Sequence, residues 1–273
     1  MAILITGERG FVGSHVTSCL KERGYDVFFL NCDISNREKV LGFVSAKSVE
    51  AVIHLAGVSN KKNEKLYQRI NVEGTKNIAD LCKKMGVGRI VFMSSSRVNS
   101  SFSNPYIDSK REAEKIVVNS GIPYIILRPS IVYGPGDKKN IGFLLKTAKT
   151  LSLIPLLKFR LQPLFVGDLA KVVDGCLGLA PSRAINIIGP TISYEDFLKL
   201  FREMGYKFYF FRAPWLLAWL IKIVSRLPFS PMPYWQVQSL LADEVYKGDD
   251  WQRIFNIKET SLKDGIVQTV KFL

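Results

Sequence analysis

Two side chains that could move a proton, Tyr106 and Lys110, lie four residues apart where the sequence predicts the start of a helix. Residues with this spacing lie on one face of a helix. A tyrosine hydroxyl ordinarily loses its proton at about pH 10, and an ammonium group beside it favours the phenolate. Ser95 follows a predicted strand, so its hydroxyl could hold a substrate oxygen against the tyrosine. The set indicates general acid–base catalysis, although Tyr-x-x-x-Lys alone is also an ordinary helix start.

A second chemical signal opens the chain. Ala2–Thr6 is an apolar run typical of a buried strand, and Gly7, Gly10 and Gly13 follow it before a helical pattern at Ser14–Arg23. Glycines at these positions allow a tight turn, a close approach of pyrophosphate to the backbone, and close packing of helix on sheet. The helix N-terminus offers free N–H groups and its positive dipole end to the phosphates. In this context the glycines predict dinucleotide binding rather than a plain turn.

These residues need a scaffold in which strands and helices alternate. Strands are predicted at 26–30, 51–55, 89–93, 123–127 and 184–188, and helices at 36–46, 67–85, 109–119 and 168–179. The alternation predicts an α/β fold, a Rossmann-like doubly wound parallel sheet, with the ligand over the carboxyl ends of the strands. We expect residues 1–132 plus 164–190 to form the dinucleotide-binding domain, and 133–163 plus 191–273 to form a smaller C-terminal substrate lobe.

Composition narrows the class of ligand. The chain of 273 residues is 47% hydrophobic and carries a formal charge of +14, which favours an anionic small substrate or an anionic membrane face. Its lysine pairs are scattered and form no basic stripe, so we expect no nucleic-acid partner. The four cysteines lie far apart without metal-ligand spacing, which predicts free thiols in a reducing compartment. With two histidines and a first strand at the N-terminus, we expect no His-rich metal site and no secretory signal.

The chain resembles the extended short-chain dehydrogenase/reductases, in particular the nucleotide-sugar epimerase/dehydratase group. The matching stretches are Thr6–Gly13 (TGERGFVG), Asp33–Ser35, His54–Gly57 (HLAG), Asn71–Thr75 (NVEGT), Ser94–Ser96, Tyr106–Lys110 (YIDSK), Leu127–Gly136 (LRPSIVYGPG), Val166–Ala170 and Thr260–Gly265. Together they span nearly the whole chain. The motifs are specific for the superfamily and far less so for the substrate.

The resemblance implies roles for single residues. Tyr106 resembles the catalytic base, Lys110 its pKa-lowering partner and ribose ligand, and Ser95 the catalytic hydroxyl, with Ser96 the less favoured alternative. Residues placed at the NAD(P) cofactor are Gly7, Arg9, Gly10, Phe11, Val12, Gly13, Asn31, Asp33, Leu55, Ala56, Gly57, Pro129 and Val132, with Tyr106 and Lys110. Residues placed at the substrate are Ser96, Asn140, Lys158 and Arg160, and no metal is implied.

Three departures from the family pattern bear on the reaction. The loop between Ser95 and Tyr106 is shorter than in many sugar epimerases, and 97–100 (RVNS) replaces their Val-Tyr-Gly turn, as in a bacterial subgroup of 4-keto-sugar reductases and epimerases. Asn31 ends the second strand where an acidic residue would favour NAD, whereas Arg9 would favour NADP, so neither cofactor is chosen. The acidic pair expected in dehydratases is absent at 96–97, which disfavours dehydration.

We therefore expect an NAD(P)-dependent nucleotide-sugar epimerase or 4-keto-sugar reductase of surface-polysaccharide synthesis, cytoplasmic and homodimeric, whose substrate is a nucleotide-diphosphate sugar. One alternative is a structural or assembly subunit that keeps the dinucleotide. The other is a membrane-peripheral enzyme on a lipid-linked sugar, which contacts the membrane through 214–226. That segment is far shorter than the roughly 20 apolar residues that span a bilayer. It fits either an interfacial helix or a helix buried over the cleft or between subunits.

Overall fold

The computed structural model describes residues 1–45, 47–59, 63–139, 141–150, 153–212, 223–227, 234, 237–238 and 242–272. The chain divides into two compact units. The first unit comprises Met1–Ser130, Val166–Ile187 and Gly248–Glu259, and the second comprises Ile131–Phe165, Ile188–Lys247 and Thr260–Leu273. The expected boundaries differ from these by a few residues, except at 248–259. The sequence assigned that stretch to the second lobe, and the structure places it in the first unit.

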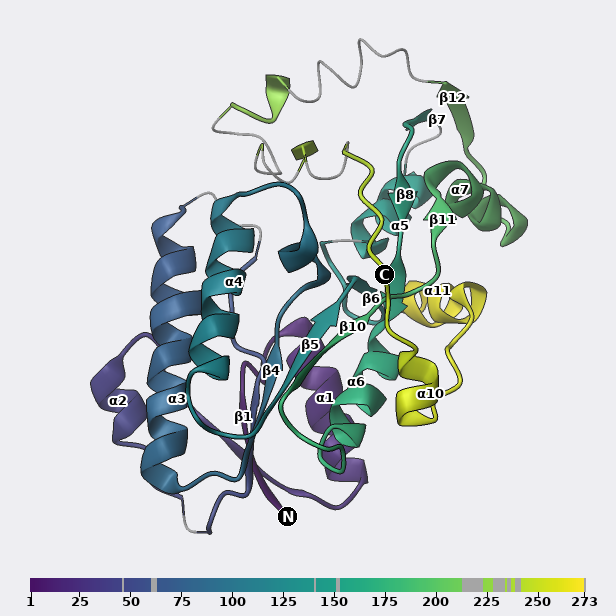
Figure 1. Cartoon of the computed structure of the whole chain (residues 1–273). Coiled ribbons are helices and arrows are strands. Elements are labelled where there is room, and N and C mark those ends of the chain that lie inside the picture. The colour runs from purple at the N-terminus through teal and green to yellow at the C-terminus, as the bar shows by residue number, and fades with distance from the viewer. Residues whose placement is uncertain are drawn as a thin grey trace. The chain divides into compact units, whose positions relative to one another are not determined.

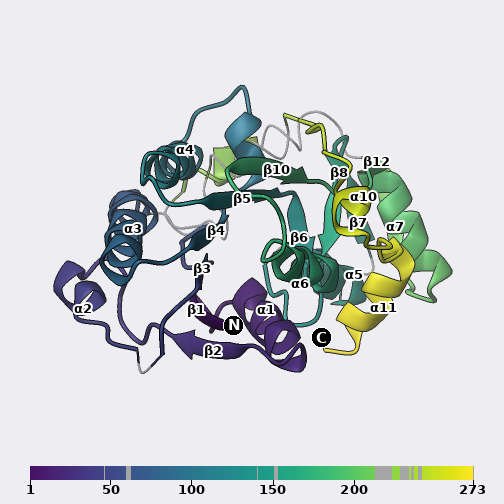
Figure 2. The same cartoon turned by 60° about the horizontal axis from the view of Figure 1, so that its bottom comes forward.

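A parallel six-stranded sheet forms the centre of the first unit (Figure 1). Its strand order is β10-β5-β4-β3-β1-β2 (Figure 2). Its strands are β1 (Ala2–Thr6), β2 (Asp26–Phe29), β3 (Ala51–His54), β4 (Arg89–Met93), β5 (Tyr124–Pro129) and β10 (Arg183–Ile187). Every neighbouring pair is parallel. The predicted doubly wound sheet is therefore confirmed, including the strand expected near 184–188.

Helices cover both faces of this sheet. They are α1 (Phe11–Glu22), α2 (Arg37–Leu41), the π-helix η1 (Tyr67–Glu73), α3 (Gly74–Met85), the 3₁₀-helix η2 (Ser96–Asn99), α4 (Pro105–Val118), α6 (Val166–Gly175) and α10 (Trp251–Phe255). Helix α1 packs against α6 on one face, and α3 packs against α4 on the other (Figure 2). Buried apolar side chains of the strands, such as Leu4 and Phe92, join Ile78 and Leu81 of α3 in one core.

Two helices differ from their predicted form. The pattern at 67–85 predicted one helix, and the structure has a π-helix turn followed by α3. Helix α4 begins earlier than expected, because Pro105 occupies its first turn and the side chain of Asn104 accepts a hydrogen bond from Ile107 N at 2.9 Å. Both features are standard ways to start a helix. The early start places Tyr106 and Lys110 in the same helix.

The second unit has three two-stranded sheets among its described residues: β6 (Ile131–Tyr133) with β9 (Pro163–Phe165), β7 (Leu153–Leu156) with β12 (Tyr209–Arg212), and β8 (Arg160–Leu161) with β11 (Ile192–Ser193). Its helices are α5 (Ile141–Thr150), α7 (Tyr194–Glu203) and α11 (Leu262–Val270). Aromatic residues of α7, including Phe197 and Phe201, form its core with Phe159 and Ile266. Among the described residues, no helix has the length and apolar character needed to cross a membrane.

Candidate active site

Lys110 is held on the inner side of α4 and is only 7% exposed. Its Nζ donates a hydrogen bond to the carbonyl of Met93, at the end of β4, at 2.8 Å. The same Nζ lies 4.9 Å from the centre of the Phe92 ring, a cation–π distance. Burial lowers the pKa of Lys110 to about 8, partly opposed by the negative charge of Glu114. The ammonium is therefore fixed at the carboxyl end of the sheet, where a ligand is expected.

Tyr106 lies one turn earlier on α4 and is partly buried. Burial raises its pKa above the ordinary value, while a hydrogen bond with the Ser95 side chain and the positive charge of Arg97 act in the opposite direction. Its ring stands edge-on to that of Tyr67, with ring centres 6.0 Å apart. The serine that hydrogen-bonds to the tyrosine is thus Ser95 and not Ser96. A hydroxyl within hydrogen-bond reach is the geometry that general acid–base catalysis requires.

A second cation acts on Tyr106 in the structure, because the positive charge of Arg97 lowers the pKa of the tyrosine. The role expected of the Lys110 ammonium stays a prediction. The ammonium of Lys110 is directed at the Met93 carbonyl. The sequence did not identify Arg97 as a site residue, although its place two residues after Ser95 could have pointed to it.

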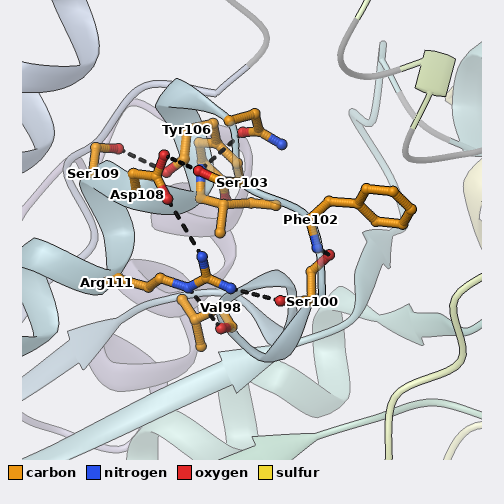
Figure 3. Close-up of polar contacts among 10 residues, drawn as sticks. Val98, Ser100, Phe102, Ser103, Tyr106, Asp108, Ser109 and Arg111 are labelled. Atoms are coloured by element: carbon orange, nitrogen blue, oxygen red, sulfur yellow. Dashed lines mark hydrogen bonds and ion pairs between the residues drawn. The ribbon is translucent and has the colours of Figure 1, made fainter.

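The loop that carries Ser95 and Arg97 is fastened to α4 by Arg111 (Figure 3). Its guanidinium donates to the carbonyls of Val98 at 3.0 Å and Ser100 at 2.6 Å. The backbone N–H of Arg97 also donates to Ser95 Oγ at 3.3 Å. These bonds set η2 at a fixed distance from the helix that bears Tyr106. Arg111 is a positioning residue that the sequence did not reveal.

A second chain of hydrogen bonds holds the start of α4 from its other side. The side-chain amide of Asn71 donates to the carbonyl of Val58 at 3.0 Å and to Ser109 Oγ at 2.9 Å. Ser109 Oγ in turn donates to the carbonyl of Tyr106 at 2.7 Å, and both residues are labelled in Figure 3. Asn71 thus ties the segment after β3 to α4. Gly57 lies in the same place, since an added Cβ there would meet Asn71 and Lys110 at 3.2 and 3.3 Å.

The glycines after β1 form a cradle that a side chain would fill. Gly7 has a φ of +80°, and a Cβ on it would lie 2.6 Å from Ala56 N. A Cβ on Gly13 would lie 2.0 Å from the carbonyl oxygen of Gly7, so α1 is packed closely against the turn. At the end of β4, the buried Ser94 Oγ has no hydrogen-bond partner among the described residues. These features fit a dinucleotide whose pyrophosphate sits at the N-terminus of α1.

Three polar residues expected at the cofactor follow the first two strands: Arg9 follows β1, and Asn31 and Asp33 follow β2. Asp33 accepts hydrogen bonds from Ser35 N at 3.0 Å and Ser35 Oγ at 2.8 Å, and the backbone bond holds its pKa below the ordinary value. Arg69 NH2 also lies 3.7 Å from the Asp33 carboxylate. Asn31 is exposed just after β2, and the exposed Arg9 side chain lies 3.4 Å from Glu8. The structure therefore leaves the choice between NAD and NADP open.

His54 at the end of β3 is buried and serves the scaffold. Its Nδ1 shares a 2.7 Å hydrogen bond with Thr6 Oγ1, and its Nε2 shares one of 3.0 Å with Thr75 Oγ1. Burial, helped by the charge of Lys110, lowers its pKa to about 3. The neutral ring links β1, β3 and α3 beneath the cofactor cradle. Within the described residues, no cluster of His, Cys, Asp or Glu could hold a metal ion.

The expected substrate residues are distributed over both units. Ser96 is buried in the first unit at the start of η2, and Lys158 is exposed in the second unit. Of the expected cofactor residues, Pro129 ends β5 in the first unit and Val132 lies in β6 of the second. Asn140 lies outside the described residues.

Arg160 is already engaged within the second unit. Its guanidinium meets the Asp243 carboxylate at 2.9 Å. The basic segment 138–163 contains no acidic residue of its own. The acid that pairs with Arg160 comes from a distant part of the sequence, so this arginine must exchange partners if it is to bind phosphate.

The order of the strands and the glycine cradle after β1 define a Rossmann-type dinucleotide-binding fold. Residues 3–187 match the model of the NAD dependent epimerase/dehydratase family, which is more than half of the chain. The protein belongs to that family.

Individual relatives show the breadth of the family. The chain is 30% identical over 183 residues to the UDP-glucose 4-epimerase of Vibrio cholerae, covering 53% of this chain and 56% of that protein. It is 28% identical over 145 residues to the decarboxylating sterol-4-alpha-carboxylate 3-dehydrogenase of Saccharomyces cerevisiae, covering 45% and 42%. The chain thus spans about half the length of these curated relatives.

The fold also matches solved structures along its whole length. The UDP-glucose 4-epimerase of Thermotoga maritima, crystallised with UDP-glucose, superposes with a TM-score of 0.78 at 18% identity, covering 100% of this chain and 98% of that one. At this identity the likeness concerns the fold.

Proposed function

We propose that the protein is an NAD(P)-dependent oxidoreductase or epimerase that acts on the hydroxyl or keto group of a nucleotide-diphosphate sugar. The observation that carries this proposal is the hydrogen bond between Ser95 and Tyr106, at the same sheet edge as the buried ammonium of Lys110. The cofactor supplies a nicotinamide carbon that exchanges a hydride with the substrate carbon. Tyr106 moves the proton of the reacting oxygen, and Ser95 holds that oxygen in place.

The protonation states support this division of roles. Burial keeps Tyr106 protonated at neutral pH, so it can donate a proton when a keto group is reduced. In the opposite direction it must accept a proton as phenolate, which the Arg97 charge and the Ser95 hydroxyl stabilise. Lys110 binds the ribose hydroxyls from its position beside Gly57.

A nucleotide sugar is supported by the name of the Vibrio cholerae relative and by the basic surface of the second unit. Lys158 is one of the exposed lysines of that segment, with Lys138, Lys139 and Lys146. Neutral substitution, Lys158→Gln, should raise the KM for a nucleotide sugar with a smaller effect on kcat. Lys83→Gln, an exposed lysine of α3, is the matched control.

Location and assembly form part of the same proposal. A cytoplasmic site is supported by the cysteines Cys19, Cys32, Cys82 and Cys176, all of which are free thiols. The family resemblance supports a homodimer and a place in surface-polysaccharide synthesis. The apolar sequence at 214–226, mostly outside the described residues, supports peripheral membrane contact.

The deciding experiment compares wild type with Tyr106→Phe. Any dinucleotide that co-purifies is released and identified by mass and redox state, and hydride exchange with nucleotide sugars is then followed by absorbance. The variant should keep the dinucleotide and lose turnover by about 10² to 10⁴-fold, the usual worth of a general acid or base. A tightly held, oxidised NAD indicates an epimerase, and an exchangeable cofactor indicates a reductase.

A structural subunit is the competing outcome of this experiment. It predicts that the wild type holds a dinucleotide that no nucleotide sugar reduces or oxidises. Near-normal turnover by Tyr106→Phe would also refute the assigned site.

A further inference from the structure

The β7–β12 sheet of the second unit turns apolar side chains outward. The register pairs Leu153 with Tyr209, Ile154 with Phe210, and Pro155 with Phe211. Side chains alternate between the two faces of a strand. Ile154 and Phe210 point inward and join the core of the unit. The neighbouring pairs, at 153/209 and 155/211, therefore face away from that core.

Exposure confirms this sidedness. Leu153 is 55% exposed, Tyr209 is 74% exposed and Phe211 is 39% exposed, whereas Ile154 is 3% exposed. A soluble surface ordinarily places polar residues on the outer face of such a sheet. Three large apolar or aromatic side chains, side by side on one outer face, indicate an interaction surface.

A basic side chain lies beside this face. Lys207 is exposed two residues before Tyr209. Between Glu203 and Asp243 the sequence has four basic residues, Lys207, Arg212, Lys222 and Arg226, and no acidic residue. This composition favours a partner with a dense negative charge.

The composition of the same stretch is typical of a membrane interface. Three of the four tryptophans of the chain, Trp215, Trp219 and Trp235, lie within it. Tyrosine and tryptophan gather where apolar acyl chains meet polar headgroups, and basic residues bind anionic headgroups. Apolar, aromatic and basic residues together therefore match both the acyl chains and the headgroups of a lipid surface.

We propose that the outward face of the β7–β12 sheet, with Lys207 beside it, docks on the surface of an anionic lipid bilayer. Leu153, Tyr209 and Phe211 enter the headgroup region, and Lys207 contacts anionic headgroups. A second copy of this chain accounts for the basic residues less well, because this chain itself carries +14. The docking goes beyond the proposed reaction and needs no turnover to be observed.

The test measures sedimentation of the full chain with vesicles of phosphatidylcholine alone and of phosphatidylcholine mixed with phosphatidylglycerol. Wild type should bind the anionic vesicles and lose binding as salt rises. One basic residue at an anionic surface is worth about 1 kcal/mol, so Lys207→Glu should weaken binding at least about fivefold. Tyr209→Ser combined with Phe211→Ser should weaken it further.

The matched control substitutions are made at exposed residues of the first unit. Val44 is 85% exposed, and Lys83 is exposed on α3. Val44→Ser and Lys83→Glu should leave vesicle binding unchanged. All the substituted side chains are exposed, so thermal unfolding midpoints should stay near that of wild type, which separates docking from folding.

Three results would overturn the proposal. The first is no vesicle binding by wild type, and the second is equal binding to both kinds of vesicle. The third is binding that the β12 variants leave intact, which would place the contact elsewhere on the chain. A self-association of wild type that Tyr209→Ser abolishes without any vesicle effect would instead make this face a contact between copies.

Discussion

The side chains of Ser95 and Tyr106 are hydrogen-bonded to each other across a ten-residue loop. The loop is held at both ends: Ser95 follows β4, and Tyr106 sits in the first turn of α4. Arg111 fastens the middle of it through the carbonyls of Val98 and Ser100. These contacts hold the two hydroxyls next to each other.

Ser95→Ala should weaken turnover more than substrate binding. Loss of the hydroxyl removes a bond that lowers the pKa of Tyr106, and it also removes the contact for the substrate oxygen. We expect kcat to fall about 10-fold to 100-fold, within the range of single acid–base or oxygen-holding groups. Ser101→Ala, an exposed serine of the same loop, is the control. Equal effects of both variants would show that only the loop was disturbed.

Arg97→Gln should move the pH profile of oxidation. The Arg97 charge lowers the pKa of Tyr106, so its removal raises that pKa. Oxidation of an alcohol uses the phenolate, so the rise of kcat with pH should shift to higher pH. Arg97→Lys, which keeps the charge, should shift it less. Spectrophotometric titration of the phenolate checks the pKa directly, and an unchanged curve in Arg97→Gln would contradict this role.

Gly13→Ala should abolish dinucleotide binding. The added Cβ would lie 2.0 Å from the carbonyl oxygen of Gly7, so the turn or α1 has to move. Gly178→Ala is a suitable control, since its nearest neighbour would be 4.0 Å away. Binding is measured by quenching of protein fluorescence with NAD and with NADP. Wild-type affinity in Gly13→Ala would mean that the cofactor does not use this cradle.

His54 should make the fold sensitive to acid. Its pKa in the folded chain is about 3, well below the ordinary value, so the unfolded chain takes up its proton first. The neutral ring contributes stability that is complete above about pH 6.5 and is lost as the pH falls toward 3, by up to about 1.4 kcal/mol per pH unit. His54→Asn should flatten this dependence, and His15→Gln should not. Urea unfolding between pH 7 and 4 measures both slopes, and equal slopes would refute the assignment.

Elements set by local pattern could be predicted from the sequence. The β1–glycine–α1 unit was predicted because strand, turn and helix signals are consecutive in the chain. The parallel sheet followed from the alternation of apolar runs with helical spacing. Tyr106 and Lys110 shared a helix face by their spacing alone.

Contacts between distant residues could not be predicted in this way. Arg111 binds backbone carbonyls, which every residue type carries, so no pattern announces it. The π-helix η1 contains Asn71, whose partners Val58 and Ser109 lie in other segments. Arg160 was expected at the substrate, and the acid that pairs with it, Asp243, comes from a distant part of the sequence.

Residues 248–259 belong to the first unit, although most of the second unit precedes them in the sequence. Asp249 accepts a hydrogen bond from the backbone N–H of Asn186 in β10, Trp251 is fully buried, and Phe255 lies against Gly175. A chain cut after residue 187, where the family match ends, would lose these contacts, and loss of a buried tryptophan alone costs about 3 to 5 kcal/mol. The first unit therefore cannot be isolated as one continuous stretch of sequence. Exchange of the second unit between relatives requires five junctions in this chain, because the last segment of the first unit lies near the end of the sequence.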